Sequence, residues 1–94
     1  MREKKIEQAL VREVRCRGGL CVKWNAGTSG WPDRIVLLPG GRVGFVEVKA
    51  PGEVSRPLQV HRHEQLRRLG YRVYVLDDMD EIDDLVRRIG GEVR

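Results

Sequence analysis

Three side chains that together could hydrolyse a phosphodiester lie close to one another in the chain: Asp33, Glu47 and Lys49. Asp33 comes just before an apolar segment, and Glu47 and Lys49 lie two residues apart on the next one. Alternate side chains of a strand share a face, so Glu47 and Lys49 would point the same way. Two carboxylates about 4 Å apart repel by roughly 4 kcal/mol at an effective dielectric of about 20, and a divalent cation turns that repulsion into attraction. The pattern predicts metal-assisted phosphodiester chemistry.

Each of these residues also has a structural interpretation. Asp33 follows the rigid Pro32 and could accept hydrogen bonds from local amides as a turn aspartate. Glu47 lies between two valines, and a buried glutamate is rare unless it is paired. On an open face it would form only an ion pair with Lys49. Lys49 alone would indicate no function. Its spacing to Glu47 and the preceding Asp33 are what favour a catalytic role.

The composition favours a nucleic-acid partner. The chain has 94 residues, a net charge of +4 and 18 basic residues, most of which are arginine. The planar guanidinium suits phosphate oxygens. Acidic residues gather at 77–84, so the first seventy residues are more basic than the average. The alternative is a basic protein with no nucleic-acid function.

Cysteines and hydropathy limit the remaining classes. Cys16 and Cys21 lack the spacing of a zinc site and are expected to be incidental thiols in a reducing compartment. No apolar run reaches membrane length, and the N-terminus lacks the apolar core of a signal peptide. We therefore expect a soluble protein without membrane contact, located in the cytoplasm.

The hydropathy pattern predicts one α/β domain spanning residues 1–94. The expected elements, in chain order, are a helix at 3–17, strands at 20–24, 34–38 and 43–49, a helix starting at 55–57, a strand at 71–76 and a helix starting at 78–80. The short turn at 39–42 makes a hairpin antiparallel, and a helical crossover makes the last two strands parallel. Strands this apolar are covered on both faces, so we expect a mixed four-stranded sheet flanked by helices.

The second helix has clear predicted limits. Ser55 is expected to be its N-cap, and Gly70 ends it. It carries Leu58, Leu66 and Leu69.

These motifs resemble the VRR-NUC family of the PD-(D/E)XK nuclease superfamily. The resemblance rests on Gly30-Trp31-Pro32-Asp33, Glu47-Val48-Lys49, the following Pro51-Gly52 and the helical Gln59, and it extends from about residue 3 to residue 85. It implies the restriction-endonuclease-like αβββαβ core of that superfamily, which agrees with the order of elements read above.

The resemblance also implies roles for particular residues. Asp33 and Glu47 would be ligands of Mg²⁺ (or Mn²⁺), joined by the backbone carbonyl of Val48. Lys49 would orient the attacking water, and Gln59 would face the site from the second helix. On residue type alone, Gln59 would be an exposed helix residue.

Relatives in the superfamily often add a glutamate from the first helix. Glu7 has the spacing that resembles archaeal Holliday-junction resolvases, and we assign it to the site. Glu3 lies one turn earlier on the same side and is the competing candidate. Either glutamate could instead be solvated.

Several residues outside this set could contact DNA. Ser29 precedes the Asp33 motif at a position where some relatives place a hydroxyl against phosphate. Arg56 and Arg62 lie on or beside the second helix, where arginines could contact the DNA backbone. His61 and His63 are two residues apart and point in different directions, so we do not expect a joint metal site. His61 could contact DNA, as Arg62 could, but a solvated helix face is favoured for both.

The resulting hypothesis is a metal-dependent, structure-specific DNA endonuclease. Stand-alone members of this size occur in phages and bacteria and resemble homodimers that cut branched DNA such as four-way (Holliday) junctions, which implies action in the bacterial cytoplasm or an infected host cell. A candidate dimer surface is the apolar face of the last helix, formed by Ile82, Leu85, Val86 and Ile89. The alternatives are a nicking or flap-cutting nuclease, a non-catalytic DNA-binding module, and a structural or partner-binding protein.

Overall fold

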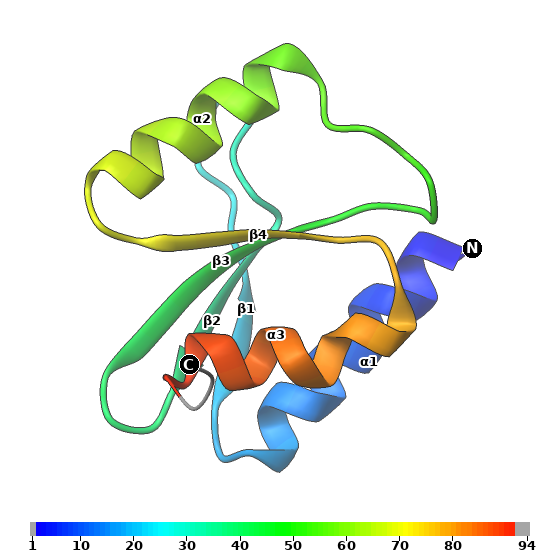
Figure 1. Cartoon of the computed structure of the whole chain (residues 1–94), viewed down its shortest axis with the longest axis vertical. Coiled ribbons are helices and arrows are strands. Elements are labelled where there is room, and N and C mark those ends of the chain that lie inside the picture. The colour runs from blue at the N-terminus through cyan, green and yellow to red at the C-terminus, as the bar shows by residue number, and fades with distance from the viewer. Residues whose placement is uncertain (1, 92–94) are drawn as a thin grey trace.

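A mixed β-sheet forms the centre of the molecule. Figure 1 shows the computed structural model of the chain, which describes residues 2–91. The strands are β1 (Leu20–Lys23), β2 (Arg34–Leu38), β3 (Arg42–Val48) and β4 (Arg72–Leu76). They lie in the order β1-β2-β3-β4, with β1–β2 and β2–β3 antiparallel and β3–β4 parallel. The predicted hairpin and parallel crossover are both confirmed.

Helices cover both faces of this sheet. They are α1 (Arg2–Cys16), α2 (Pro57–Arg68) and α3 (Ile82–Ile89), and the short 3₁₀ helix η1 (Met79–Glu81) leads into α3. α1 and α3 lie together under one face, and α2 lies alone over the other (Figure 1). The predicted α/β architecture and αβββαβα order are confirmed. Within residues 2–91, none of the helices combines the length and apolar character that a membrane crossing needs.

The apolar core lies between the sheet and the α1–α3 layer. On α1, Ile6, Leu10 and Val14 follow the four-residue spacing of one helical stripe, and all three are buried. Strand alternation directs Val46 and Val48 of β3 into the same layer. The other buried members are Val36, Leu38, Leu76, Ile82, Leu85, Val86 and Ile89. The apolar side chains of the last helix are therefore core residues, and they do not form the exposed dimer surface considered above.

The limits of α2 differ in part from the prediction. The N-cap is Arg56 and not Ser55. A residue within the helix stabilises its first turn: the side-chain oxygen Oε1 of Gln59 accepts a hydrogen bond from the Arg56 backbone N–H at 2.8 Å. This is one half of a capping box, and it makes a Ser55 hydroxyl unnecessary. The end is as predicted, since Gly70 follows the C-cap with a φ of 95°.

One leucine of the α2 region is buried, Leu66, whereas Leu58 and Leu69 are exposed. The other buried side chains of α2 are Gln59 and His63. The three buried positions follow i, i+4, i+7 spacing, so they share one face. Beneath this face lie both polar side chains of the sheet and a small apolar cluster in which Phe45 and Val73 pack with Leu66.

Candidate active site

Asp33 lies at the point where β2 begins beside the end of β3. Its Oδ2 accepts a hydrogen bond from the backbone N–H of Val48 at 2.8 Å. The N–H and C=O of one strand residue point to the same edge of the strand, so the Val48 carbonyl lies on the Asp33 side as well. The register agrees, because Arg34 pairs with Val46 and the two strands separate just beyond. Asp33 is thus fixed next to the two residues with which it was grouped from sequence.

Glu47 and Lys49 share the face of the sheet that α2 covers. Both are buried, at 3% and 8% exposure. The Lys49 Nζ lies 4.0 Å from Glu47 Oε2, which is the outer limit of an ion pair. An ion pair on an open solvent face, which was the structural alternative, does not describe this arrangement. The two side chains lie in a polar layer enclosed between the sheet and a helix.

Gln59 of α2 forms hydrogen bonds to both charged side chains. Its amide Nε2 donates to Glu47 Oε2 at 2.9 Å, and its Oε1 accepts from Lys49 Nζ at 2.9 Å. With the Arg56 N–H bond, the Gln59 amide makes three hydrogen bonds while 95% buried. The structure therefore places Gln59 with Glu47 and Lys49, and it is not an exposed helix glutamine.

His63 is the residue of this layer that sequence reasoning missed. It is 2% exposed, and its Nε2 lies 3.6 Å from Glu47 Oε1. Both of these atoms are buried without a hydrogen-bond partner among the described residues. The available signal was its position, four residues after Gln59 and hence on the same helix face. Burial lowers the pKa of His63, and the positive charges of Arg67 and Lys49 act in the same direction.

The electrostatics of Glu47 show a site that holds excess negative charge. Burial raises the pKa of Glu47 to about 7, the negative charge of Asp33 adds to the shift, and Lys49 opposes it. A cation placed between the carboxylates would remove this penalty. Among residues 2–91 no group of three or more His, Cys, Asp or Glu side chains is placed to hold a metal ion. Two carboxylates, a carbonyl and water nevertheless fit Mg²⁺, which commonly binds through one or two carboxylates and keeps several waters.

The two candidate glutamates of α1 have separate positions. Glu7 Oε2 forms an ion pair with Arg34 Nε at 2.7 Å on the α1 side of the sheet. Glu3 lines the pocket that contains Asp33 and Glu47, and its charge contributes to the raised Glu47 pKa. Arg34 follows Asp33 and points to the opposite face, which explains why its partner Glu7 is drawn away from the site. The geometry therefore favours Glu3 over the expected Glu7.

An open pocket of about 340 Å³ gives access to this group. Its lining residues come from the start of α1, the end of β3 and the entry to α2: Glu3, Asp33, Glu47, Val48, Lys49, Glu53, Val54, Arg56 and Gln59. Arg56 is the one arginine among them. The lining is mostly polar and includes four carboxylates beside Lys49 and Arg56.

Arg62 and Ser29 lie beside the pocket and contact each other. The Arg62 guanidinium carbon is 4.5 Å from the centre of the Trp31 ring, and Arg62 Nε donates to the Ser29 carbonyl at 3.4 Å. Gly30 packs against the same helix, because a Cβ there would lie 2.7 Å from the Leu58 side chain. Arg62 thus secures the segment leading to Asp33, in addition to any contact with DNA.

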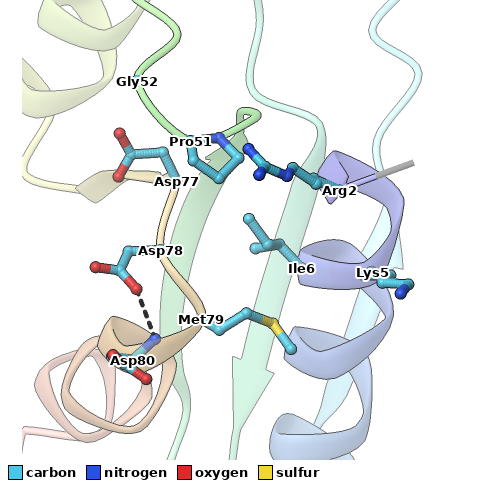
Figure 2. A pocket seen from close by; sticks show the side chains of 9 residues that line it. All are labelled: Arg2, Lys5, Ile6, Pro51, Gly52, Asp77, Asp78, Met79 and Asp80. Atoms are coloured by element: carbon cyan, nitrogen blue, oxygen red, sulfur yellow. Dashed lines mark hydrogen bonds between the residues drawn. The ribbon is translucent and has the colours of Figure 1, made fainter.

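A larger pocket of about 530 Å³ lies near the first one (Figure 2). It separates the first turns of α1 from the segment between β4 and α3, and Pro51 and Gly52 close one side. The Asp78 carboxylate accepts a hydrogen bond from the Asp80 N–H at 2.9 Å and caps η1. This pocket is lined by aspartates and basic side chains but by none of Asp33, Glu47, Lys49 and Gln59, so pocket size does not mark the candidate site here.

Comparison with known proteins identifies the class. The chain matches no family model. It is 49% identical over 81 residues to a protein of Acyrthosiphon pisum secondary endosymbiont phage 1 described as "Putative nuclease p44", a match that covers 85% of this chain and 87% of the relative. A solved structure described as a VRR_NUC domain superposes with a TM-score of 0.86 at 32% identity, covering 93% of this chain and 96% of the other.

A second solved structure, described as a VRR_NUC domain protein, has a TM-score of 0.77 at 18% identity and covers 99% of this chain and 91% of the other, which shows a shared fold. The fold is that of a VRR_NUC nuclease domain. The chain belongs to the VRR-NUC family. The resemblance read from Asp33, Glu47 and Lys49 is thereby confirmed.

Proposed function

We propose that this nuclease is a metal-dependent DNA endonuclease whose site is the Asp33–Glu47–Lys49–Gln59 cluster. The observation that carries the proposal is the Glu47 carboxylate, buried next to Asp33 with its Oε1 lacking a hydrogen-bond partner. A buried carboxylate in this state is costly without a cation. Asp33, Glu47 and the Val48 carbonyl would hold Mg²⁺ (or Mn²⁺). When bound, the cation would polarise a phosphoryl oxygen and stabilise the leaving oxygen.

The chain's own groups supply positioning. Lys49 Nζ is held by Gln59 Oε1 and lies within ion-pair range of Glu47, so its remaining N–H groups can donate to a water beside the phosphate. Gln59 fixes both charged side chains relative to each other, which keeps the water and the carboxylates in register. Arg56 at the rim is placed to bind a neighbouring phosphate.

The direct test is a cleavage panel. Labelled four-way junction, flap, nicked and linear duplex DNA are incubated with the protein and Mg²⁺, Mn²⁺ or a chelator. We expect cleavage that requires the metal and falls at least about 100-fold in Asp33→Asn and Lys49→Ala. Asp80→Asn, an exposed aspartate outside the site, is the matched control and should cut normally. Failure of the wild type to cut any of these substrates contradicts the nuclease proposal, and full activity of Asp33→Asn contradicts the site.

We propose further that the nuclease acts as a homodimer on branched DNA. Three apolar side chains of the α2-facing sheet surface, Leu20, Val22 and Leu37, are 64%, 44% and 37% exposed because α2 does not reach β1. Two copies of an uncharged face can pack together without burying unpaired charge. A two-fold dimer would present two sites to a two-fold substrate such as a four-way junction.

Light scattering coupled to gel filtration tests the dimer. Leu20→Glu should convert a dimer to a monomer and reduce junction cleavage more than flap cleavage. Val60→Glu changes a similarly exposed valine on the outer side of α2 and should leave the dimer intact. A monomeric wild type, or preferential cutting of flaps or nicked duplex, would direct the proposal to a nicking or flap-type enzyme instead.

A further inference from the structure

Two buried atoms face each other in the site without hydrogen bonds: Glu47 Oε1 and His63 Nε2. Their separation of 3.6 Å is beyond hydrogen-bond range but too short for a water molecule to lie between them. Buried polar groups are almost always satisfied, so a facing pair of unsatisfied atoms indicates a contact that forms in another state of the site.

Side chains of α2 face both oxygens of the Glu47 carboxylate. Gln59 Nε2 donates to Oε2 at 2.9 Å, and one turn further along the same helix face the His63 ring meets Oε1. Glu47 is 3% exposed, so the helix and the sheet determine how its carboxylate is turned. A carboxylate held at both oxygens keeps its remaining lone pairs directed towards the pocket and Asp33.

We propose that His63 is a positioning residue for the nuclease site, which donates from Nε2–H to Glu47 Oε1 and orients this carboxylate for the cation. The inference rests on the proposed metal-dependent function. Hydrogen bonds of catalytic sites often tighten when the complex forms, so a separation of 3.6 Å is compatible with a hydrogen bond in the loaded site. Groups that hold the ligands of a metal are typically worth 10–100-fold in metal affinity or activity.

A packing role makes different predictions from a positioning role. If His63 only fills space between α2 and β3, an aromatic ring of similar size without a donor should serve equally well. If His63 donates to Glu47, the donor must be kept. Phenylalanine keeps the ring and removes the donor, whereas the side-chain amide of glutamine can place an N–H close to the Nε2 position.

The experiment compares His63→Phe, His63→Gln and the matched control His61→Phe, which changes the exposed histidine of the same helix. Mn²⁺ binding is measured by calorimetry without DNA, and thermal melting is measured in chelator. We expect His63→Phe to bind Mn²⁺ about 10–100-fold more weakly without a lower melting temperature. His63→Gln should stay within about threefold of the wild type, and His61→Phe should be unchanged. Equal Mn²⁺ affinity in His63→Phe and the wild type overturns the role of His63.

A second measurement separates this inference from the nuclease proposal. Long-range ¹H–¹⁵N spectra of the metal-free protein report which ring nitrogen of His63 carries the proton. We expect the Nε2–H form, and a shift of its resonances in Glu47→Gln. The Nδ1–H form would overturn the inference even if the wild type cuts DNA. A wild type that neither cuts DNA nor binds Mn²⁺ contradicts the nuclease proposal, while these spectra still decide whether His63 donates to Glu47.

Discussion

The two faces of β3 are equally buried and chemically opposite. Val46 and Val48 point into the α1–α3 layer, and Glu47 and Lys49 point into the α2 layer. All four are at most 8% exposed. The difference is therefore one of partners and not of depth. Apolar neighbours complete the first layer. The second layer combines a small apolar cluster of Phe45, Leu66 and Val73 with the charged side chains that Gln59 connects, and two of its polar atoms have no hydrogen-bond partner among the described residues.

Stability and function therefore depend on different layers of the molecule. Burying apolar side chains stabilises a fold by about 25 cal/mol per Å². Burying an ionised carboxylate next to another opposes folding unless a cation is present. The α1–α3 layer should thus stabilise the domain, and the α2 layer should reduce stability in return for a reactive site. Three substitutions and one change of pH test this difference between the two layers.

The largest effect is expected for Glu47→Gln. The substitution removes a proposed metal ligand, so DNA cleavage should fall by about 1000-fold or more. It also removes a buried charge, so the melting temperature in chelator at pH 8 should rise. Single-turnover cleavage and thermal melting measure the two effects. The control is Glu64→Gln, an exposed glutamate of α2. A lower melting temperature in Glu47→Gln would contradict the division of roles between the layers.

Leu10→Ala should have the opposite signature. Leu10 is fully buried in the α1–α3 layer, and truncating such a residue costs about 2–5 kcal/mol. In a domain of this size the melting temperature should fall by roughly 10 °C or more. Mn²⁺ affinity measured well below the transition should not change. Leu69→Ala, at an exposed leucine, is the control for side-chain truncation. Weaker Mn²⁺ binding in folded Leu10→Ala would show that the layers are coupled.

The free energy of unfolding should depend on pH through the burial of Glu47. The pKa of Glu47 is about 7 in the folded protein and near 4.5 when unfolded. The folded state holds the extra proton between these values, so this stabilising contribution is complete below pH 4.5 and lost as the pH rises through 7. The loss is about 3 kcal/mol. Denaturant unfolding in chelator from pH 4.5 to 8, compared with Glu47→Gln, isolates this contribution from that of His63, whose lowered pKa acts in the opposite direction. Parallel curves would contradict it.

The smallest effect is expected for Ser55→Ala. A serine N-cap is worth about 1 kcal/mol, but the N-cap of α2 is Arg56, whose N–H is bound by Gln59. Ser55→Ala should therefore change the free energy of unfolding by less than about 0.5 kcal/mol. Gln59→Ala should cost more, because it removes the helix entry and the site contacts together. A cost near 1 kcal/mol for Ser55→Ala would show that the Ser55 hydroxyl does cap the helix.

The sequence was sufficient for the fold because most of its signals are local. The four-residue spacing of Ile6, Leu10 and Val14 and the apolar runs of the strands predict the elements, and short turns predict the pairing. Asp33, Glu47 and Lys49 could be grouped because strand alternation and a hairpin are local as well.

The errors share one physical cause. The place of His63 in the site was missed, because a polar helix face normally meets solvent. Here that face meets Glu47 of the neighbouring strand, and only the tertiary structure shows this. The position of Glu7 depends likewise on Arg34, whose orientation follows from the strand register.

The attachment of α2 has a consequence for the motions of the protein. Its inner face contributes one buried apolar side chain, Leu66, beside the polar Gln59 and His63. Segments held by few apolar contacts open locally at low free energy. Backbone amides of α2 should exchange with deuterium faster than those of α1. Because Gln59 and His63 hold both the helix and the site, a ligand that engages Glu47 should slow that exchange, so occupancy of the site can be followed from the amides of α2.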